Sequence, residues 1–205
     1  MVSAKPKLPR AQQKEATRER IRCAALELFA TQGFAATTTK AIADRAQVAA
    51  GTIFVHASDK DDLLFLVMHD QLSAAVEKAF ATLPDRPFLD QLMHIFGHFF
   101  RLYGELPQLA QAFVRNLPGK SGPNAARVNG LTFGFMNRLG ELITSAQQRG
   151  ELATDLLPGQ VAQNLFGLYF MVLMGWLSGF VSLQDALDPG LRNALALQIR
   201  GLLPR

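Results

Sequence analysis

Potential metal ligands recur within one short segment of the chain. Asp90, His94 and His98 are spaced every fourth residue, which places them on one face of a helix. Carboxylates and imidazoles bind Zn²⁺, but three ligands spread along three turns are too far apart for one ion. The spacing therefore predicts no metal site and no cofactor, and it leaves open only whether His94 and His98 share an ion as a pair.

The chain shows no plausible nucleophile and base for enzymatic catalysis, so we expect it not to be an enzyme. Its one cysteine, Cys23, lies beside an apolar stripe and is expected to be inert core. A single cysteine excludes an internal disulfide and, with no apolar run resembling a signal peptide in residues 1–14, indicates a cytoplasmic protein. A small-molecule-binding helical enzyme stays as an alternative that measurable turnover would support.

The positive charge is concentrated at one end. Residues 1–60 contain ten Lys or Arg and five Asp or Glu, whereas residues 61–205 carry a net charge of −1. Such an asymmetry favours an N-terminal module that binds a polyanion and a nearly neutral module with another role. If only the charge is considered, a solvated basic tail on a helix is the alternative explanation.

Two short helical patterns occur in "AIADRAQVAAGTIFVH", residues 41–56. They predict helices over about 39–46, capped by Thr37 or Thr38, and over 50–56, joined by a tight turn at 47–49. This arrangement matches a helix-turn-helix, whose second helix enters the major groove of DNA. Small residues at the start of that second helix would let its backbone approach bases and phosphates closely.

These short helices need a partner, because helices under about 12 residues are marginal alone. An apolar stripe predicts that partner over residues 11–31, where Gly33 ends the helix and Phe34 folds back over its last turn. The shared core is expected to contain Ile21, Leu28, Phe29, Phe34, Ile42, Val48 and Ile53.

The remaining chain also reads as helix. Ser58 is expected to cap a helix that runs to about Thr82, with Asp61 at the capping-box position. Further helices are expected at about 88–103, 107–117, 123–149, 158–183 and 190–202. No segment alternates with period two, so the predicted fold is all-α with about nine helices.

The run "GFAATTTKAIADRAQVAAGTIFVHASDKDDLL" (residues 33–64) resembles the DNA-binding domain of the TetR family of transcriptional regulators. The resemblance extends over about residues 11–65. It implies a disordered basic tail at 1–10, a DNA-binding domain at 11–57 with the helix-turn-helix at about 38–57, and an effector-binding and dimerisation domain at 58–205.

The resemblance also implies which side chains meet DNA. Lys60 has its own argument, because a cation in the first turn of a helix opposes the helix dipole unless a phosphate lies nearby. Gln47 departs from the family pattern by replacing a turn glycine, at a cost of about 1 kcal/mol if it is left-handed. The residues expected to contact DNA are Thr38, Lys40, Ala50, Gly51, Thr52, Phe54, His56 and Lys60.

Residues 161–183 carry no charge, so a membrane-spanning helix has to be considered. Gln163 and Asn164 lie inside the run and no basic cluster flanks it, which favours a buried helix and no membrane insertion. A membrane-anchored regulator is the remaining alternative. The resemblance implies instead that the last two long helices form a four-helix interface with a second subunit. Residues expected at that interface are Gly175, Gly179, Leu191, Leu195, Ile199 and Leu202.

The second domain is expected to enclose a small lipophilic or aromatic effector, because few charged residues interrupt its apolar segments. Candidate effector-binding residues are Phe96, His98, Phe99, Phe113, Phe133, Asn137, Tyr169 and Trp176. The predicted function is a homodimeric repressor that binds a near-palindromic site on double-stranded DNA and is released by the effector. A ligand-dependent activator is the alternative.

Overall fold

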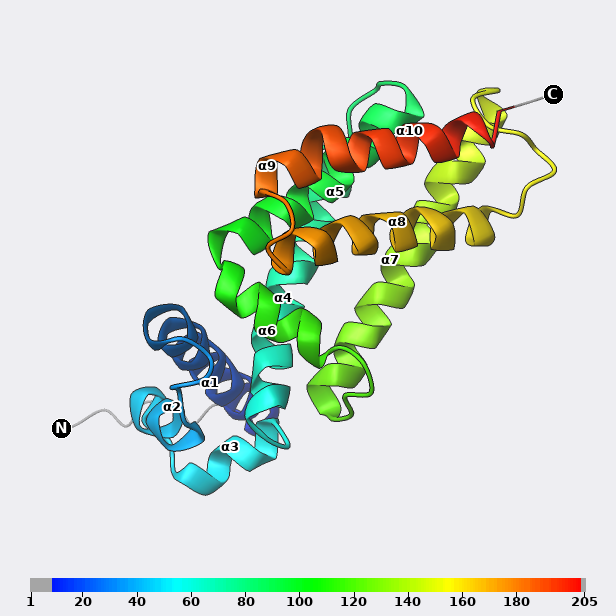
Figure 1. Ribbon diagram of the computed structural model, residues 1–205. Helices are drawn as coiled ribbons and strands as arrows, with labels where there is room; N and C mark the ends of the chain where they lie inside the picture. Colours follow the sequence, from blue (N-terminus) through cyan, green and yellow to red (C-terminus); the bar gives the residue numbers. More distant parts are fainter. Residues whose placement is uncertain (1–8, 204–205) are drawn as a thin grey trace. The chain divides into compact units, whose positions relative to one another are not determined.

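The computed structural model describes residues 9–203, and these form helices and connecting loops without a strand, as predicted (Figure 1). The predicted basic tail, residues 1–10, lies outside the described residues except for Pro9 and Arg10, and Arg10 begins the first helix. The elements are α1 (Arg10–Gln32), α2 (Thr39–Ala46), α3 (Ala50–His56), α4 (Lys60–Ala81), α5 (Phe88–Glu105), α6 (Pro107–Asn116), α7 (Pro123–Gln148), α8 (Pro158–Leu177), α9 (Leu183–Asp185), the π-helical segment η1 (Ala186–Leu191) and α10 (Arg192–Arg200).

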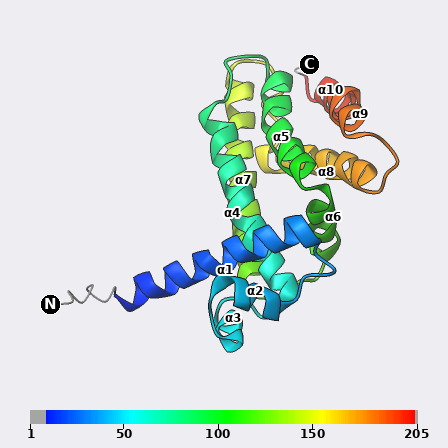
Figure 2. The same ribbon diagram turned by 90° about the vertical axis from the view of Figure 1, so that its left-hand side faces the viewer.

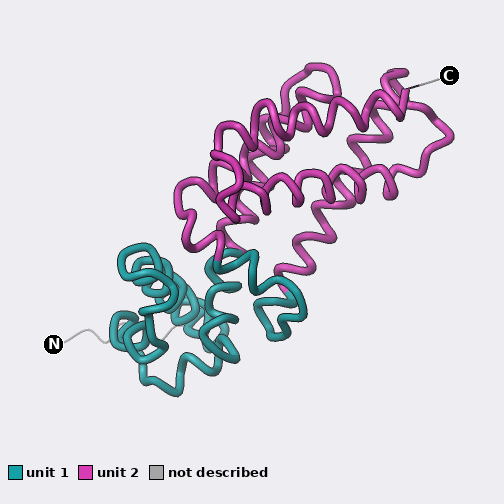
Figure 3. Tube along the Cα trace, in the orientation of Figure 1, with its two compact units in different colours: residues 1–68, 112–126 teal, residues 69–111, 127–205 magenta. Residues whose placement is uncertain are grey.

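The chain forms two compact units (Figure 3). Unit 1 comprises the chain up to Met68 together with Ala112–Ala126, and unit 2 comprises His69–Gln111 and Arg127–Arg205. The unit boundaries fall inside α4, α6 and α7. Unit 1 therefore combines the three N-terminal helices with a segment that is distant in sequence.

The core of unit 1 forms along α1, beside which α2 runs (Figure 2). Ile21, Leu28 and Phe29 are buried as predicted, and the Phe34 ring lies 5.2 Å from the Phe29 ring after the turn at Gly33. Cys23 is exposed, so its predicted core position is wrong. It lies just beyond the edge of the buried stripe, where its thiol contacts the Glu19 carboxylate.

The turn between the two short helices is closed by local hydrogen bonds. The Thr38 side chain caps α2 by accepting from the Ala41 amide at 3.1 Å, which confirms one of the two predicted caps. Gln47 ends α2 with φ 55° and ψ 51°, in the left-handed region. The amides of Gln47 and Val48 donate to the last carbonyls of α2, so this strained residue fixes the angle between the helices.

Replacing Gln47 by glycine is expected to stabilise the protein. A side chain in the left-handed region costs about 1–2 kcal/mol, and glycine removes that cost. Glycine also raises the conformational entropy of the unfolded chain, which offsets part of the gain. We expect Gln47→Gly to raise the free energy of unfolding by about 0.5–1 kcal/mol, measured by urea denaturation. Gln47→Ala is the control, since it keeps the strain and should give no gain.

The start of α4 differs from its predicted form. The cap is Asp59 rather than Ser58, because the Asp59 carboxylate accepts from the Asp62 amide at 2.8 Å. The Asp62 carboxylate in turn accepts from the Ser58 amide at 3.1 Å. Asp62, rather than the predicted Asp61, therefore takes the capping-box position.

The bounds of the two C-terminal helices differ from the prediction. Helix α8 ends at Leu177 rather than near residue 183, because Gly179 adopts a φ of 79° and the amides of Gly179 and Phe180 close the helix on Trp176 and Gly175. The last helix begins with α9 and η1 and kinks at Asp188. Within residues 9–203, no helix is both long enough and apolar enough to cross a bilayer.

Candidate functional site

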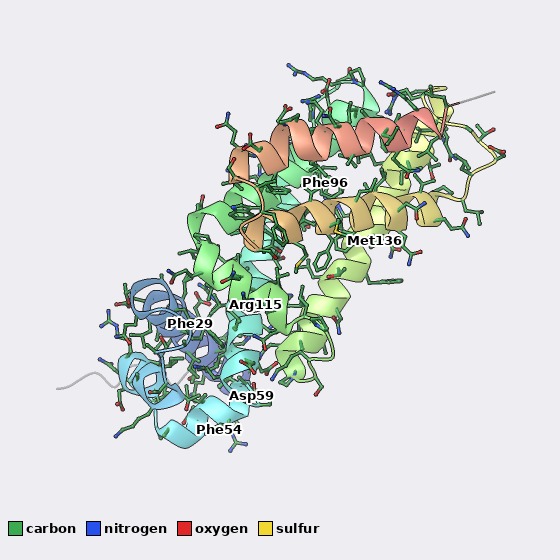
Figure 4. The ribbon with its side chains drawn as sticks, viewed as in Figure 1. Phe29, Phe54, Asp59, Phe96, Arg115 and Met136 are labelled. Atoms are coloured by element: carbon green, nitrogen blue, oxygen red, sulfur yellow. The ribbon has the colours of Figure 1, made fainter. Side chains whose placement is uncertain are left out.

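Helix α3 presents a solvent-facing surface of small and apolar residues. Ile53 on its inner side is fully buried, whereas Phe54 and Val55 are 59% and 64% exposed. Gly51 lies on the same outer side, one helical turn before them, and a Cβ there would meet nothing within 4 Å. Figure 4 labels Phe54 on α3 and Phe29 among the helices of unit 1. Sequence reasoning missed Val55, although its spacing of four from Gly51 indicates the same face.

The other residues expected to contact DNA differ in how exposed they are. Lys40 on α2, Thr38 before it and Ala50 at the start of α3 are exposed, and Thr52 is half-buried. Arg45 on α2 is held by Glu27 of α1 at 2.6 Å, so its charge is partly neutralised. The freely exposed surface of α2 and α3 thus offers one cation, Lys40, beside hydroxyl, backbone and apolar groups.

His56 and Lys60 point into unit 1. His56 is buried, and this burial, reinforced by the positive charges of Lys14 and Arg18, lowers its pKa. The Lys60 ammonium donates to the Phe34 and Ala35 carbonyls at 3.0 and 3.2 Å and lies 4.6 Å from the Phe34 ring centre. In this structure Lys60 therefore closes the loop after α1, which explains a cation in the first turn of α4 without a phosphate.

A fully buried carboxylate joins this region to the start of α7. Asp62 accepts from the backbone amides of Asn124 and Ala125 at 3.1 Å each, so it caps α7. The Asn124 side chain donates to Asp62 and to the His56 carbonyl, both at 2.9 Å. Gly122 has a φ of 142°, and a Cβ there would lie 2.5 Å from the Asp62 carboxylate. The C-terminal end of α3 is therefore tied to a loop almost seventy residues away in sequence.

An ion pair strengthens the same junction. The Lys120 ammonium donates to both carboxylate oxygens of Asp59 at 2.8 Å. Burial alone would raise the pKa of Asp59, but the hydrogen bonds from Lys120 and from the Asp62 amide hold that pKa below its ordinary value. The loop before α7 is thus a structural part of unit 1, as its inclusion in that unit indicates.

Four of the predicted effector residues come together in unit 2. The rings of Phe96 and Tyr169 stack at 4.7 Å, and Phe99 lies 5.8 Å from Tyr169. Phe100 connects this stack to Trp176 at 6.1 Å. The buried Tyr169 hydroxyl has a pKa raised well above its ordinary value, because burial disfavours the phenolate. We call Phe96, Phe99, Phe100, Phe135, Phe166, Tyr169 and Trp176 the aromatic cluster.

The other four predicted effector residues lie elsewhere. Phe113 belongs to unit 1, where its ring packs 5.1 Å from Phe65. Phe133 and Asn137 are on the exposed side of α7. His98 is buried on another side of α5, with its ring 4.9 Å from His94. Phe133, Asn137 and His98 lie on helices that contribute to the cluster, but on other sides of those helices.

The predicted dimer residues need a correction. Leu191 and Leu195 are fully buried and Leu202 nearly so, which makes them core of the protomer rather than a surface that a second subunit could cover. Gly179 lies beyond the end of α8, so it does not form a helix-packing motif with Gly175. Ile199 is half-buried. Leu191, Leu195 and Leu202 do lie on one side of the last helix, but that side faces the core of the protomer itself.

Two of the three potential metal ligands on α5, Asp90 and His94, have other polar partners. Asp90 pairs with Arg192 at 3.2 Å, and the His94 imidazole lies 3.0 Å from the Thr82 hydroxyl and 3.1 Å from the Ala79 carbonyl. In the part of the chain that the structure describes, no three His, Cys, Asp or Glu side chains are grouped as a metal site.

Three comparisons bear on this fold and its exposed α3 surface. The family profile described as bacterial regulatory proteins, tetR family, matches residues 21–67. The fatty acid metabolism regulator protein of Bacillus subtilis (strain 168) is 24% identical over 155 residues, which cover 75% of this chain and 79% of that protein. The HTH-type transcriptional regulator HbdR of Aromatoleum sp. (strain CIB) is 43% identical over 58 residues, which cover 28% and 25% of the two chains.

A solved structure of a similar protein has the same fold. Thermus thermophilus FadR, a TetR-family transcriptional repressor in complex with lauroyl-CoA, superposes with a TM-score of 0.72 at 25% identity, covering 92% of this chain and 96% of that one. The short-helix pair and the helical second unit define a helix-turn-helix transcriptional regulator. Residues 21–67 match the DNA-binding domain profile of the tetR family, and the whole chain is similar in fold to the TetR-family repressor from Thermus thermophilus.

Proposed function

We propose that this protein is a homodimeric repressor that binds a near-palindromic operator through α3 and releases it when a lipophilic effector occupies unit 2. The exposed outer side of α3 carries the proposal, because Phe54 and Val55 have no folded-state reason to face water. Lys40 and Thr38 would contact phosphates beside them. His56 and Lys60 would reach phosphate only by giving up the positions described above.

The aromatic cluster is the proposed effector site. Apolar rings from α5, α7 and α8 surround Tyr169, whose neutral hydroxyl would orient a polar group of the guest. The Thermus thermophilus relative contains lauroyl-CoA, so an acyl thioester is the first candidate. Its acyl chain satisfies the predicted lipophilic character, whereas its coenzyme A part is more highly charged than the apolar lining alone suggests.

The test starts from the purified full-length protein and a random pool of DNA duplexes. We expect selection to return a motif with two-fold symmetry, and the association constant to fall with salt concentration, because Lys40 neutralises a phosphate in each half-site. Dodecanoyl-CoA should then release the selected duplex, whereas free coenzyme A should not. A motif without symmetry, or a duplex retained with every acyl-CoA, would contradict the proposal.

The proposed dimer surface is the outer side of α8 and α10, which pack together in unit 2. Exposed positions on α8 include Asn164, Gly167 and Met171, at helical spacing, and those on α10 include Leu197. Met171 and Leu197 are 72% and 70% exposed. Covering each large apolar side chain contributes about 1.5–3 kcal/mol, so their pairing across two copies would stabilise a dimer.

A double substitution tests this surface. Met171→Glu with Leu197→Glu is expected to convert the dimer to a monomer in sedimentation velocity and to weaken operator binding, since two half-sites would no longer be joined. Phe133→Glu is the matched control, because Phe133 is equally exposed but lies on α7. A double variant that sediments as the parent protein does would show that another surface forms the dimer.

A further inference from the structure

Unit 2 contains a cleft that is separate from the aromatic cluster. Its volume is about 520 Å³, and three segments line it: the end of α4 with the loop that follows, one side of α5, and the region from η1 to α10. Helix α5 contributes Met93, Gly97 and Arg101 to the cleft and Phe96 and Tyr103 to the core, on two different sides. The volume lies within the range of small-molecule sites.

The lining of the cleft is cationic. Arg86, Arg101 and Arg192 border it together with Asp90 and Asp188. Both carboxylates are engaged by Arg192, at 3.2 Å for Asp90 and 3.0 Å for Asp188. Neither Arg86 nor Arg101 has a carboxylate within ion-pair distance among residues 9–203.

The arrangement of these cations suits an anion. Guanidinium groups bind phosphate and carboxylate oxygens in bidentate fashion, and Arg192, which also lines the cleft, is oriented by two carboxylates. His94 and Thr82 add a polar edge, where they already bond to each other. The pKa of the neighbouring His98 is lowered by burial first and by the charge of Arg101 second.

Gly97 leaves open space where it lines the cleft, because a Cβ there would meet nothing within 4 Å. Glycine inside a helix costs about 1 kcal/mol relative to alanine, so a glycine at this position of α5 is unfavourable for the helix itself. The cleft thus combines open space at Gly97 with two arginines that have no carboxylate partner.

We propose that this cleft is a binding site for a phosphate-bearing small molecule, held by Arg86 and Arg101. Two sources share that chemistry: a free phosphorylated metabolite, and the phosphate groups of an acyl-CoA whose chain lies in the aromatic cluster. In the first case the protein has two ligand sites in unit 2, and in the second the cleft completes the effector site.

The test is isothermal titration of the full-length protein with inorganic pyrophosphate. We expect saturable binding with one site per chain below about 5 mM. Arg86→Gln with Arg101→Gln should weaken it at least about tenfold, because two charge-assisted contacts are lost. Arg127→Gln with Arg200→Gln is the matched control: it makes the same charge change at exposed arginines outside the cleft lining and corrects for anions bound by the basic unit 1.

A second variant blocks the space without removing charge. Gly97→Gln is expected to abolish pyrophosphate binding while leaving the circular dichroism spectrum and operator binding unchanged. Pyrophosphate binding that is absent in the parent protein, or equal in the cleft variants and the control, would overturn the proposal. Operator binding measured on the same samples keeps this failure distinct from a failure of the proposed function.

Competition identifies the source of the phosphate. Displacement of pyrophosphate by dodecanoyl-CoA in the parent protein, together with weaker dodecanoyl-CoA binding by Gly97→Gln than by the parent, assigns the cleft to the acyl-CoA phosphates. Simultaneous binding of both assigns it to a separate phosphorylated metabolite.

Discussion

Gly51→Glu is expected to abolish operator binding without unfolding the protein. Its side chain would extend from the exposed side of α3 into open space, and glutamate is a better helix former than glycine. In the groove the new carboxylate would meet phosphates and base edges without a partner, and such a like-charge juxtaposition costs several kcal/mol. With one copy in each half-site, we expect the dissociation constant to rise by at least about 100-fold, measured by fluorescence anisotropy.

Gly130→Glu is the control for this substitution. Gly130 is an exposed glycine inside α7, and a Cβ there also meets nothing within 4 Å, so the variant introduces the same charge and bulk in unit 2. It should bind the operator within about twofold of the parent protein. If both glutamate variants bound equally well, α3 would not be the helix that enters the groove.

Asp62→Ala is expected to have the largest effect on stability. The substitution removes the acceptor of four hydrogen bonds and leaves the amides of Asn124 and Ala125 and the Asn124 side chain buried without it. Each unsatisfied buried group costs about 1–3 kcal/mol, so we expect a loss of about 3–5 kcal/mol in urea denaturation at fixed protein concentration.

The neighbouring Asp61 provides the comparison. Its carboxylate is partly exposed and lies 3.8 Å from Lys120, so Asp61→Ala should cost about 1 kcal/mol or less. Asn124→Ala should fall between the two, since it removes the side-chain bonds and keeps the backbone cap on Asp62. Equal stability of the Asp62 and Asp61 variants would mean that the loop before α7 is not held by this carboxylate.

Local signals predicted most of unit 1. The cap at Thr38, the end of α1 at Gly33 and the two short helices follow from hydrogen bonds and backbone angles within a few residues, which sequence records directly. The left-handed conformation of Gln47 agrees with the family pattern, which has a glycine at this turn position.

The residues whose roles the sequence did not predict depend on contacts that are distant in sequence. The roles of Asp62 and Lys60 require partners about sixty and twenty-six residues away, and no local pattern indicates them. Leu191 and Leu195 have the spacing of an interface stripe, but spacing alone does not tell whether the protomer itself or a second copy covers a face. The arginine cleft gathers three segments that no motif connects.

The composition of unit 1 also limits how the protein can be re-engineered. A chimera that transplants only the contiguous stretch through Met68 into another regulator would leave Asp62 facing a foreign loop and Lys120 behind. The portable module is the discontinuous pair of segments, residues up to Met68 and Ala112–Ala126, and specificity swaps between relatives should exchange both at once.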